Sequence, residues 1–132
     1  MKKSCGCIVF NGDKVLVIKQ INDDYGFPKG HIETGESEVE CAMRETFEEV
    51  GINVKIDSDL RFSISYNVSH GVLKEAVYFV SFYLDGDICI QEEELKEAFW
   101  VDAVDVCDIL TFDNLKNLFI LAYGKYREVY YG

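Results

Sequence analysis

The chain has 132 residues, 48% of them hydrophobic, and a formal net charge of −11. This length suits one domain with a single core, residues 1–132, and the hydrophobic content excludes an intrinsically disordered chain. The negative charge argues against long nucleic acid as a partner, and no apolar run approaches the roughly 18 residues that a membrane-spanning helix needs. The first residues lack the apolar run and cleavage site of a signal peptide, so we expect a cytoplasmic protein.

Alternating apolar residues, bounded by turn residues, predict the strands. The first two, 4–10 and 13–20, flank Asn11-Gly12, which is a strong hairpin signal. Further extended segments are expected at 53–57, 60–68, 72–84, 87–90 and 97–101.

Helices are predicted in the middle of the chain, at about 38–50, and again after the last strand. A short helix is expected to begin with Asp102 as its cap and to run through Leu110. The last helix, at about 113–127, is amphipathic, with a core-facing side made of Leu115, Leu118, Phe119, Ala122 and Tyr126. These elements together predict an α/β protein in which helices cover the faces of a mixed β-sheet.

Five cysteines are scattered through the chain: Cys5, Cys7, Cys41, Cys89 and Cys107. The first two share one face of a predicted strand, where they could begin a metal site. No second Cys/His pair lies nearby in sequence, and His31 and His70 lack ligand spacing. Buried free thiols are the favoured interpretation, and they agree with a reducing compartment.

The stretch 30–52 is rich in carboxylates, with seven acids and one base, Arg44. On a helix, Glu45, Glu48 and Glu49 fall within an arc of roughly 100°. Like charges this close destabilise a helix, so the cluster indicates a bound counter-ion. A hard divalent cation, Mg²⁺ or Mn²⁺, suits a site built only from oxygen atoms. The alternative is a solvated acidic helix face.

This helix has readable ends. Ser37 and Glu40 form a capping box, and Gly51 suits the left-handed position after the last turn. The preceding stretch, 27–31, cannot be helical throughout and should form a loop facing the acids. The opposite face of the helix is expected to be buried, and it comprises Val39, Ala42, Met43, Thr46, Phe47 and Val50.

The spacing of these residues resembles the Nudix box, Gly-x5-Glu-x7-Arg-Glu-U-x-Glu-Glu-x-Gly-U, where U is a bulky aliphatic residue. In this chain the pattern reads Gly30, Glu36, Arg44, Glu45, Thr46, Glu48, Glu49, Gly51 and Ile52. Thr46 is the one departure, and its β-branched side chain can still pack on a core.

The resemblance implies the Nudix α/β/α sandwich and metal-dependent hydrolysis of a phosphoanhydride. It also implies that Glu45, Glu48 and Glu49 hold the metal, with Glu45 a candidate general base. A backbone carbonyl at Lys29 or Gly30 would add a further ligand. Glu36 and Arg44 are expected to make an ion pair that fixes the loop on the helix. A metal in such a site neutralises phosphate charge and lowers the pKa of a bound water molecule.

Members of this family often draw one more acid from a distant loop. Here Gln91 precedes three consecutive glutamates, 92–94, which could equally form a solvated acidic loop. We expect Glu94 to reach the metal, because it lies six residues before Trp100, as in the subfamily described next.

Four segments resemble the diadenosine tetraphosphate hydrolases: FPKGHIETGE at 27–36, KEAVYFVSFYL at 74–84, EELKEAFWV at 93–101 and ILTF at 109–112. By this resemblance Lys29, His31 and Lys74 contact phosphates, and Tyr78 stacks on a base. Alternatively, Tyr78 packs in the core and His31 shapes the loop. The chain departs from the subfamily where Leu95 follows the expected acid, a position that is often histidine.

Three interpretations of function remain open. The first is a dinucleoside polyphosphate hydrolase that releases ATP and AMP. The second is another Nudix pyrophosphatase, acting on a nucleoside triphosphate, a nucleotide sugar or an inositol pyrophosphate. The third is a silent nucleotide-binding domain, against which the complete acid set argues. The partner in each case is a small nucleotide or phosphorylated molecule, and the sequence does not separate a monomer from a homodimer.

Overall fold

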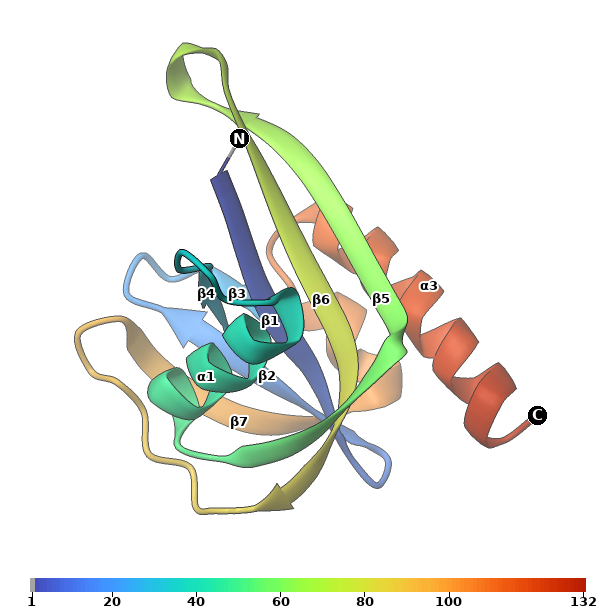
Figure 1. The fold of residues 1–132 in the computed structure, drawn as a ribbon. Helices are drawn as coiled ribbons and strands as arrows, with labels where there is room; N and C mark the ends of the chain where they lie inside the picture. Colours follow the sequence, from blue (N-terminus) through green and yellow to red (C-terminus); the bar gives the residue numbers. More distant parts are fainter. Residues whose placement is uncertain (1) are drawn as a thin grey trace.

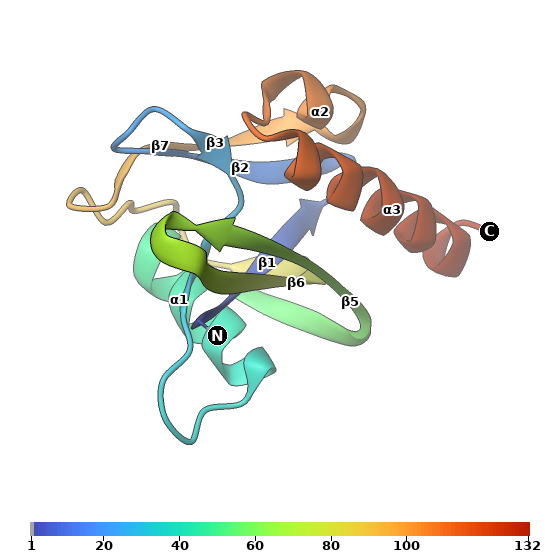
Figure 2. The same cartoon turned by 90° about the horizontal axis from the view of Figure 1, so that it is seen from above.

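The computed structural model describes residues 2–132 as a mixed seven-stranded sheet covered by helices on both faces (Figure 1). Helix α1 lies on one face, and α2 and α3 lie on the other, as the view from above shows (Figure 2). The predicted α/β/α arrangement is therefore confirmed. Among the described residues, no helix is long and apolar enough to span a membrane.

The strands are β1 (Lys2–Asn11), β2 (Lys14–Gln20), β3 (Tyr25–Gly26), β4 (Lys29–His31), β5 (Asn53–Val68), β6 (Val72–Asp85) and β7 (Leu95–Asp102). The helices are α1 (Glu38–Val50), α2 (Val106–Ile109) and α3 (Asp113–Tyr130), with the 3₁₀ turns η1 (Ser69–Gly71) and η2 (Ala103–Asp105).

The sheet runs in the order β3-β2-β1-β6-β5, with β4 added to β1 and β7 added to β2. The predicted β1–β2 hairpin is present, but its two turn residues are Gly12 and Asp13 rather than Asn11 and Gly12, because Asn11 pairs with Lys14 as the last residue of β1. Gly12 has a φ of 60°, in the left-handed region that glycine adopts readily. β1 and β6 are parallel, and the chain reaches β6 through α1 and β5. This crossover places α1 over the centre of the sheet.

Side-chain alternation along the central strands builds two cores. Ile8 and Phe10 of β1 pack toward α3, whereas Cys7 and Val9 pack toward α1. The predicted apolar face of α3 is buried as expected, with Leu115, Leu118, Phe119, Ala122 and Tyr126 all in the first core. Each face of the sheet is therefore covered by a hydrophobic core and a helix.

Three predicted elements differ from the structure. Segments 53–57 and 60–68 form one strand, β5, with an irregularity between Ile56 and Arg61. The predicted strand 87–90 is a loop, because its backbone bonds to the end of α1 through Cys89 N–H and Val50 O, at 2.9 Å. Asp102 does not cap a helix, and its carboxylate accepts a hydrogen bond from Lys14 instead.

The buried face of α1 is also rotated from the predicted one. Met43 and Phe47 are 43% and 52% exposed, whereas Glu49 is only 8% exposed. The small side chains of Ala42 and Thr46 pack against the sheet, and with the helix in this orientation Glu49 points toward the interior. The prediction of a buried Met43 and Phe47 was wrong because two adjacent stripes on this helix are apolar.

The cysteines are all free thiols. Cys5, Cys7 and Cys41 are buried, as expected, between β1 and α1. Cys89 is exposed and Cys107 is half-buried, which corrects the prediction for these two. Cys89 lies outside the core because its segment is a loop rather than a strand.

Candidate active site

Helix α1 is capped at both ends. Ser37 and Glu40 make both bonds of the capping box, at 3.1 and 2.9 Å between backbone nitrogen and side-chain oxygen. Gly51 adopts a φ of 78° and donates its N–H to the carbonyl of Phe47. Both features agree with the prediction, and they fix where the acids of the helix point.

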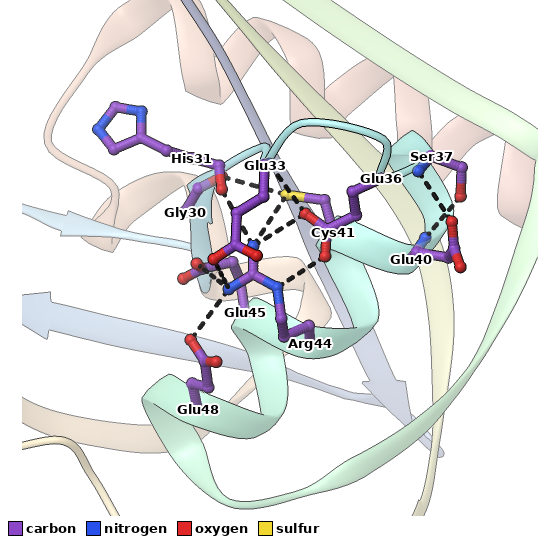
Figure 3. Close-up of polar contacts among 10 residues, drawn as sticks. All are labelled: Gly30, His31, Glu33, Glu36, Ser37, Glu40, Cys41, Arg44, Glu45 and Glu48. Atoms are coloured by element: carbon purple, nitrogen blue, oxygen red, sulfur yellow. Dashed lines mark hydrogen bonds and ion pairs between the residues drawn. The ribbon is translucent and has the colours of Figure 1, made fainter.

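Arg44 ties the loop to the helix (Figure 3). Its guanidinium donates to both oxygens of Glu36, at 2.7 and 2.9 Å, and to the carbonyl of His31 at 3.1 Å. The hydrogen bonds from Arg44 lower the pKa of Glu36 to about 2. The predicted ion pair is present, and its geometry fits a structural role because it spans the loop from end to end.

The same guanidinium donates hydrogen bonds to two further acids that the sequence did not connect to it, and it lies 3.8 Å from a third, Glu33. Nη1 of Arg44 lies 2.7 Å from Glu45 Oε1 and 3.1 Å from Glu48 Oε2. The Glu48 side chain is 49% exposed, whereas that of Glu45 is 16% exposed. Arg44 therefore offsets the repulsion between these two carboxylates, and Glu48 lies on the solvent side of the cluster.

Glu49 is the buried acid of the cluster. Its carboxylate accepts one hydrogen bond from the Lys29 backbone N–H, at 3.1 Å. Burial raises the pKa of Glu49 to about 7, and the charges of Glu45 and Glu94 act in the same direction. Burial also raises the pKa of Glu45, which Arg44 partly offsets. A nearby cation would favour both ionised forms.

A cavity of about 310 Å³ brings most of the predicted metal ligands together. Gly30, Glu45, Glu49 and Glu94 line it, but Glu48, Glu92 and Glu93 do not. The Glu45 carboxylate occupies the space that a Cβ at position 30 would need, so this position requires glycine. Within 2–132, no three acidic, histidine or cysteine side chains are gathered closely enough to enclose an ion.

The residues nevertheless fit a divalent cation. A buried carboxylate with a single hydrogen bond, a second half-buried carboxylate beside it and a third across the cavity form an all-oxygen donor set. Hard cations such as Mg²⁺ prefer such donors. Arg44 contacts only Oε1 of Glu45, so Oε2, which lies against Gly30, could serve as a ligand while the Arg44 contact is kept.

The cavity also has a basic side. Lys29, His31 and Lys74 line it together with the acids, as expected for phosphate-binding residues. Burial lowers the pKa of Lys74, and the charges of Lys29 and Lys2 lower it further. The pKa of His31 is lowered by burial and then by the charges of Lys74, Lys29 and Lys2. The acids, from α1 and the segment before β7, and the bases, from β4 and β6, thus face the same cavity.

A second cavity, of about 290 Å³, adjoins the first. The two share Gln20, Lys29 and Lys74 on their walls. The second cavity is rich in aromatic side chains, and its rings come from Tyr25, Phe27, Tyr66, Tyr78 and Phe112.

Tyr25, Tyr66 and Phe112 were not predicted as site residues. Tyr66 could have been predicted from the sequence as a site residue, because the turn at 69–71 sets a register in which Tyr66 lies opposite Lys74. Phe112 lies in the segment 109–112 that resembles the diadenosine tetraphosphate hydrolases, but nothing placed it beside Tyr25, since these two residues meet only through the fold. Thr111 contributes to that meeting, because its Oγ1 accepts a hydrogen bond from the Tyr25 N–H at 2.8 Å.

Tyr78 lies in the floor of the aromatic cavity. Its side chain is 2% exposed and packs edge-on against Phe27, with ring centroids 5.8 Å apart. A ring held in this way has no free face for a base. The core-packing alternative is the one that the structure supports, and the more accessible rings of Tyr66 and Phe112 replace Tyr78 as stacking candidates.

Comparison with known proteins adds three findings. The model of the NUDIX domain family matches residues 2–121. The asymmetrical bis(5'-nucleosyl)-tetraphosphatase of Rattus norvegicus is 27% identical over 132 aligned residues, which cover 86% of this chain and 88% of that protein. The NAD-capped RNA hydrolase NudC of Chromobacterium violaceum is 41% identical over 80 residues, but the match covers 59% of this chain and only 28% of that protein.

Among solved structures, a C. elegans Ap4A hydrolase in a binary complex superposes with a TM-score of 0.85. The match covers 98% of this chain and 100% of that chain, at 21% sequence identity. At this identity the likeness establishes the shared fold.

Proposed function

Because the chain belongs to the NUDIX family, we propose that it is a metal-dependent hydrolase of a phosphoanhydride bond in a dinucleoside polyphosphate. Diadenosine tetraphosphate, cleaved to ATP and AMP, is the substrate that we favour. The observation that carries this proposal is the pair of adjoining cavities. One is acidic, the other is aromatic, and Lys29 and Lys74 line both.

The acidic cavity would hold the metal. The proposed ligands are the Gly30 carbonyl and the carboxylates of Glu45, Glu48, Glu49 and Glu94, with Mg²⁺ or Mn²⁺ as the ion. When bound, the ion neutralises phosphate charge and lowers the pKa of a coordinated water molecule. The side chain of Glu48 does not line the cavity, so we propose it as a ligand only because of its position in the helix motif.

The protein's own side chains would position the phosphates. Lys29, His31 and Lys74 supply donors to the phosphate oxygens, and lysine tolerates small changes in oxygen position because it acts as a point charge. Glu45 lies against Gly30 inside the cavity and is our candidate for the residue that accepts a proton from the attacking water. Arg44 contributes indirectly, by holding the loop.

The aromatic cavity would hold one nucleoside. A base placed between Tyr66 and Phe112 anchors one end of the substrate, so that its phosphates cross the two lysines toward the acids. A polyphosphate chain is chemically repetitive, so the distance from the anchored base selects the bond that is cleaved. We propose that the selected bond is an asymmetric one, which releases ATP and AMP.

The similarity to the NudC protein supports a second candidate, a pyrophosphatase for another nucleotide. A nucleoside triphosphate or a nucleotide sugar could use the same aromatic cavity. An inositol pyrophosphate would not, since it has no base to place there. The net charge of −11 also argues against a long RNA as substrate.

The deciding experiment is a substrate panel with product identification. The full chain is incubated with Mg²⁺ and diadenosine tetraphosphate in ¹⁸O-labelled water, and the products are separated by ion exchange and weighed by mass spectrometry. We expect equal amounts of ATP and AMP, with the label in one product only. Two molecules of ADP as sole products, or faster turnover of a mononucleotide or nucleotide sugar, would favour the second candidate.

A further inference from the structure

Three lysines at the rim of the acidic cavity make no ion pair with any carboxylate of residues 2–132. They are Lys2, Lys29 and Lys74, and most other basic side chains of the chain do make one. Acidic residues outnumber basic ones by 24 to 13, so carboxylates are not scarce. Two other basic residues, Lys55 and Arg127, also lack an ion pair within the described part of the chain, but only at this rim do three such residues lie beside one cavity.

The three lysines are also close to one another. Lys2 and Lys74 are paired residues of the parallel β1–β6 ladder. Because side chains alternate along a strand, Lys2 is on the same face of β1 as Ser4, which lines the acidic cavity. Lys29 and Lys74 line both cavities. Lys2 therefore stands at the outer rim, one step beyond Ser4.

The neighbouring lysine, Lys3, behaves differently. It is on the opposite face of β1, where it pairs with Glu38 at 2.7 Å and with Glu75 at 3.6 Å. The positive charges of Lys2 and Lys29 lower the pKa of Lys74. Within residues 2–132, no carboxylate forms an ion pair with these three lysines to offset their repulsion. Clustered like charges are unfavourable until an anion of several charges joins them.

We infer that Lys2, Lys29 and Lys74 form a polyphosphate track, in which Lys2 contacts the phosphates farthest from the acids and makes the site prefer long phosphate chains. The track rests on the proposed function, and it adds a specificity-determining residue that the family pattern does not include. Pyrophosphate has only two phosphates, so we expect it to engage fewer of the three lysines at once. Tripolyphosphate and tetrapolyphosphate extend further along the rim.

The test is the binding of inorganic polyphosphates by calorimetry, with EDTA present so that no divalent metal contributes. Pyrophosphate, tripolyphosphate and tetrapolyphosphate are titrated into the wild-type chain and into Lys2→Gln. We expect the variant to bind tetrapolyphosphate about fivefold more weakly, which is the usual upper range for an exposed charge pair. Its affinity for pyrophosphate should change less than twofold, and Lys2→Arg should restore wild-type binding of the long chain.

Lys125→Gln is the matched control, since it removes one exposed lysine on α3, away from both cavities. It should bind all three probes as the wild type does. Equal effects of Lys2→Gln and Lys125→Gln on tetrapolyphosphate would overturn the inference, as would an equal loss for pyrophosphate. Neither result depends on turnover. A chain that binds by length but hydrolyses no phosphoanhydride with Mg²⁺ would instead overturn the proposed function alone.

Discussion

The two walls of the site are built in different ways. Most of the acidic wall comes from α1 and the loop before it, where Arg44 joins Glu36, Glu45 and Glu48, and Glu94 is added from the segment between β6 and β7. The aromatic wall gathers Tyr25 from β3, Tyr66 from β5 and other rings from distant parts of the chain. Most of the groups proposed to perform the chemistry thus sit on one loop–helix unit, whereas the rings proposed to select the substrate come from separate elements and can change one at a time.

The largest expected effect is on the acidic wall. Glu49→Gln should lower kcat by at least about 10²-fold, because a neutral amide cannot replace a charged metal ligand. Its folding should be preserved, because the amide oxygen can still accept from the Lys29 N–H. The measurement is kcat at saturating Mg²⁺ and Mn²⁺, with Glu92→Gln as a control outside the cavity.

Glu48→Gln tests whether the more exposed acid of the helix also holds the metal. If Glu48 is a ligand, we expect this variant also to lose at least about 10²-fold in kcat. Near-wild-type turnover at saturating metal would leave Glu48 only as a partner of Arg44 on the solvent side. The acidic wall would then consist of the three acids that line the cavity.

The next effect combines activity and stability. Arg44→Ala should lower the free energy of unfolding by about 2 kcal/mol, because it leaves Glu36 without its charged hydrogen bonds. Activity should fall as well, since the loop that carries Gly30 loses its attachment. Urea unfolding monitored by circular dichroism measures the first change. Lost activity at unchanged stability and metal affinity would point to direct contact between Arg44 and phosphate.

On the aromatic wall, Tyr66→Ala should raise KM for diadenosine tetraphosphate about tenfold and leave kcat nearly unchanged. Stacking holds the ground state and the transition state alike, so its loss weakens binding only. Tyr131→Ala removes an exposed ring at the far end of the chain and serves as the control. A fall in kcat with constant KM would mean that Tyr66 acts on the acidic wall instead.

The difference between the walls also explains what the sequence could predict. The capping box, the αL glycine and the pairing of Glu36 with Arg44 depend on residues a few positions apart, so their spacing was informative. The burial of Glu49 was missed, because periodicity alone could not decide which of two apolar stripes faces the sheet.

Long-range features were less accessible. Tyr78 was chosen from a local pattern, yet its burial depends on Phe27, a residue 51 positions earlier in the sequence. The loop at 87–90 has the composition of a strand, but its backbone partners belong to the end of α1. Both errors arise from contacts that no local pattern records.

The smallest expected effect concerns the first turn of α1. Hydrogen bonds from Arg61 and then Lys3 lower the pKa of Glu38 to about 2, from 4.5. A carboxyl with a lower pKa in the folded state binds fewer protons there than in the unfolded chain. Its stabilising contribution is therefore complete above about pH 5 and is lost as the pH falls toward 2.

Glu38→Gln should remove this part of the pH dependence. We expect the free energy of unfolding to fall less between pH 5 and pH 3 in the variant than in the wild type, by about 1 kcal/mol for these partly exposed pairs. Glu36 keeps its own dependence in both proteins, since it pairs with Arg44. Urea titrations at several pH values measure the slopes, with Glu92→Gln as the control. Parallel curves for Glu38→Gln and the wild type would mean that the Glu38 pairs persist in the unfolded chain or contribute nothing.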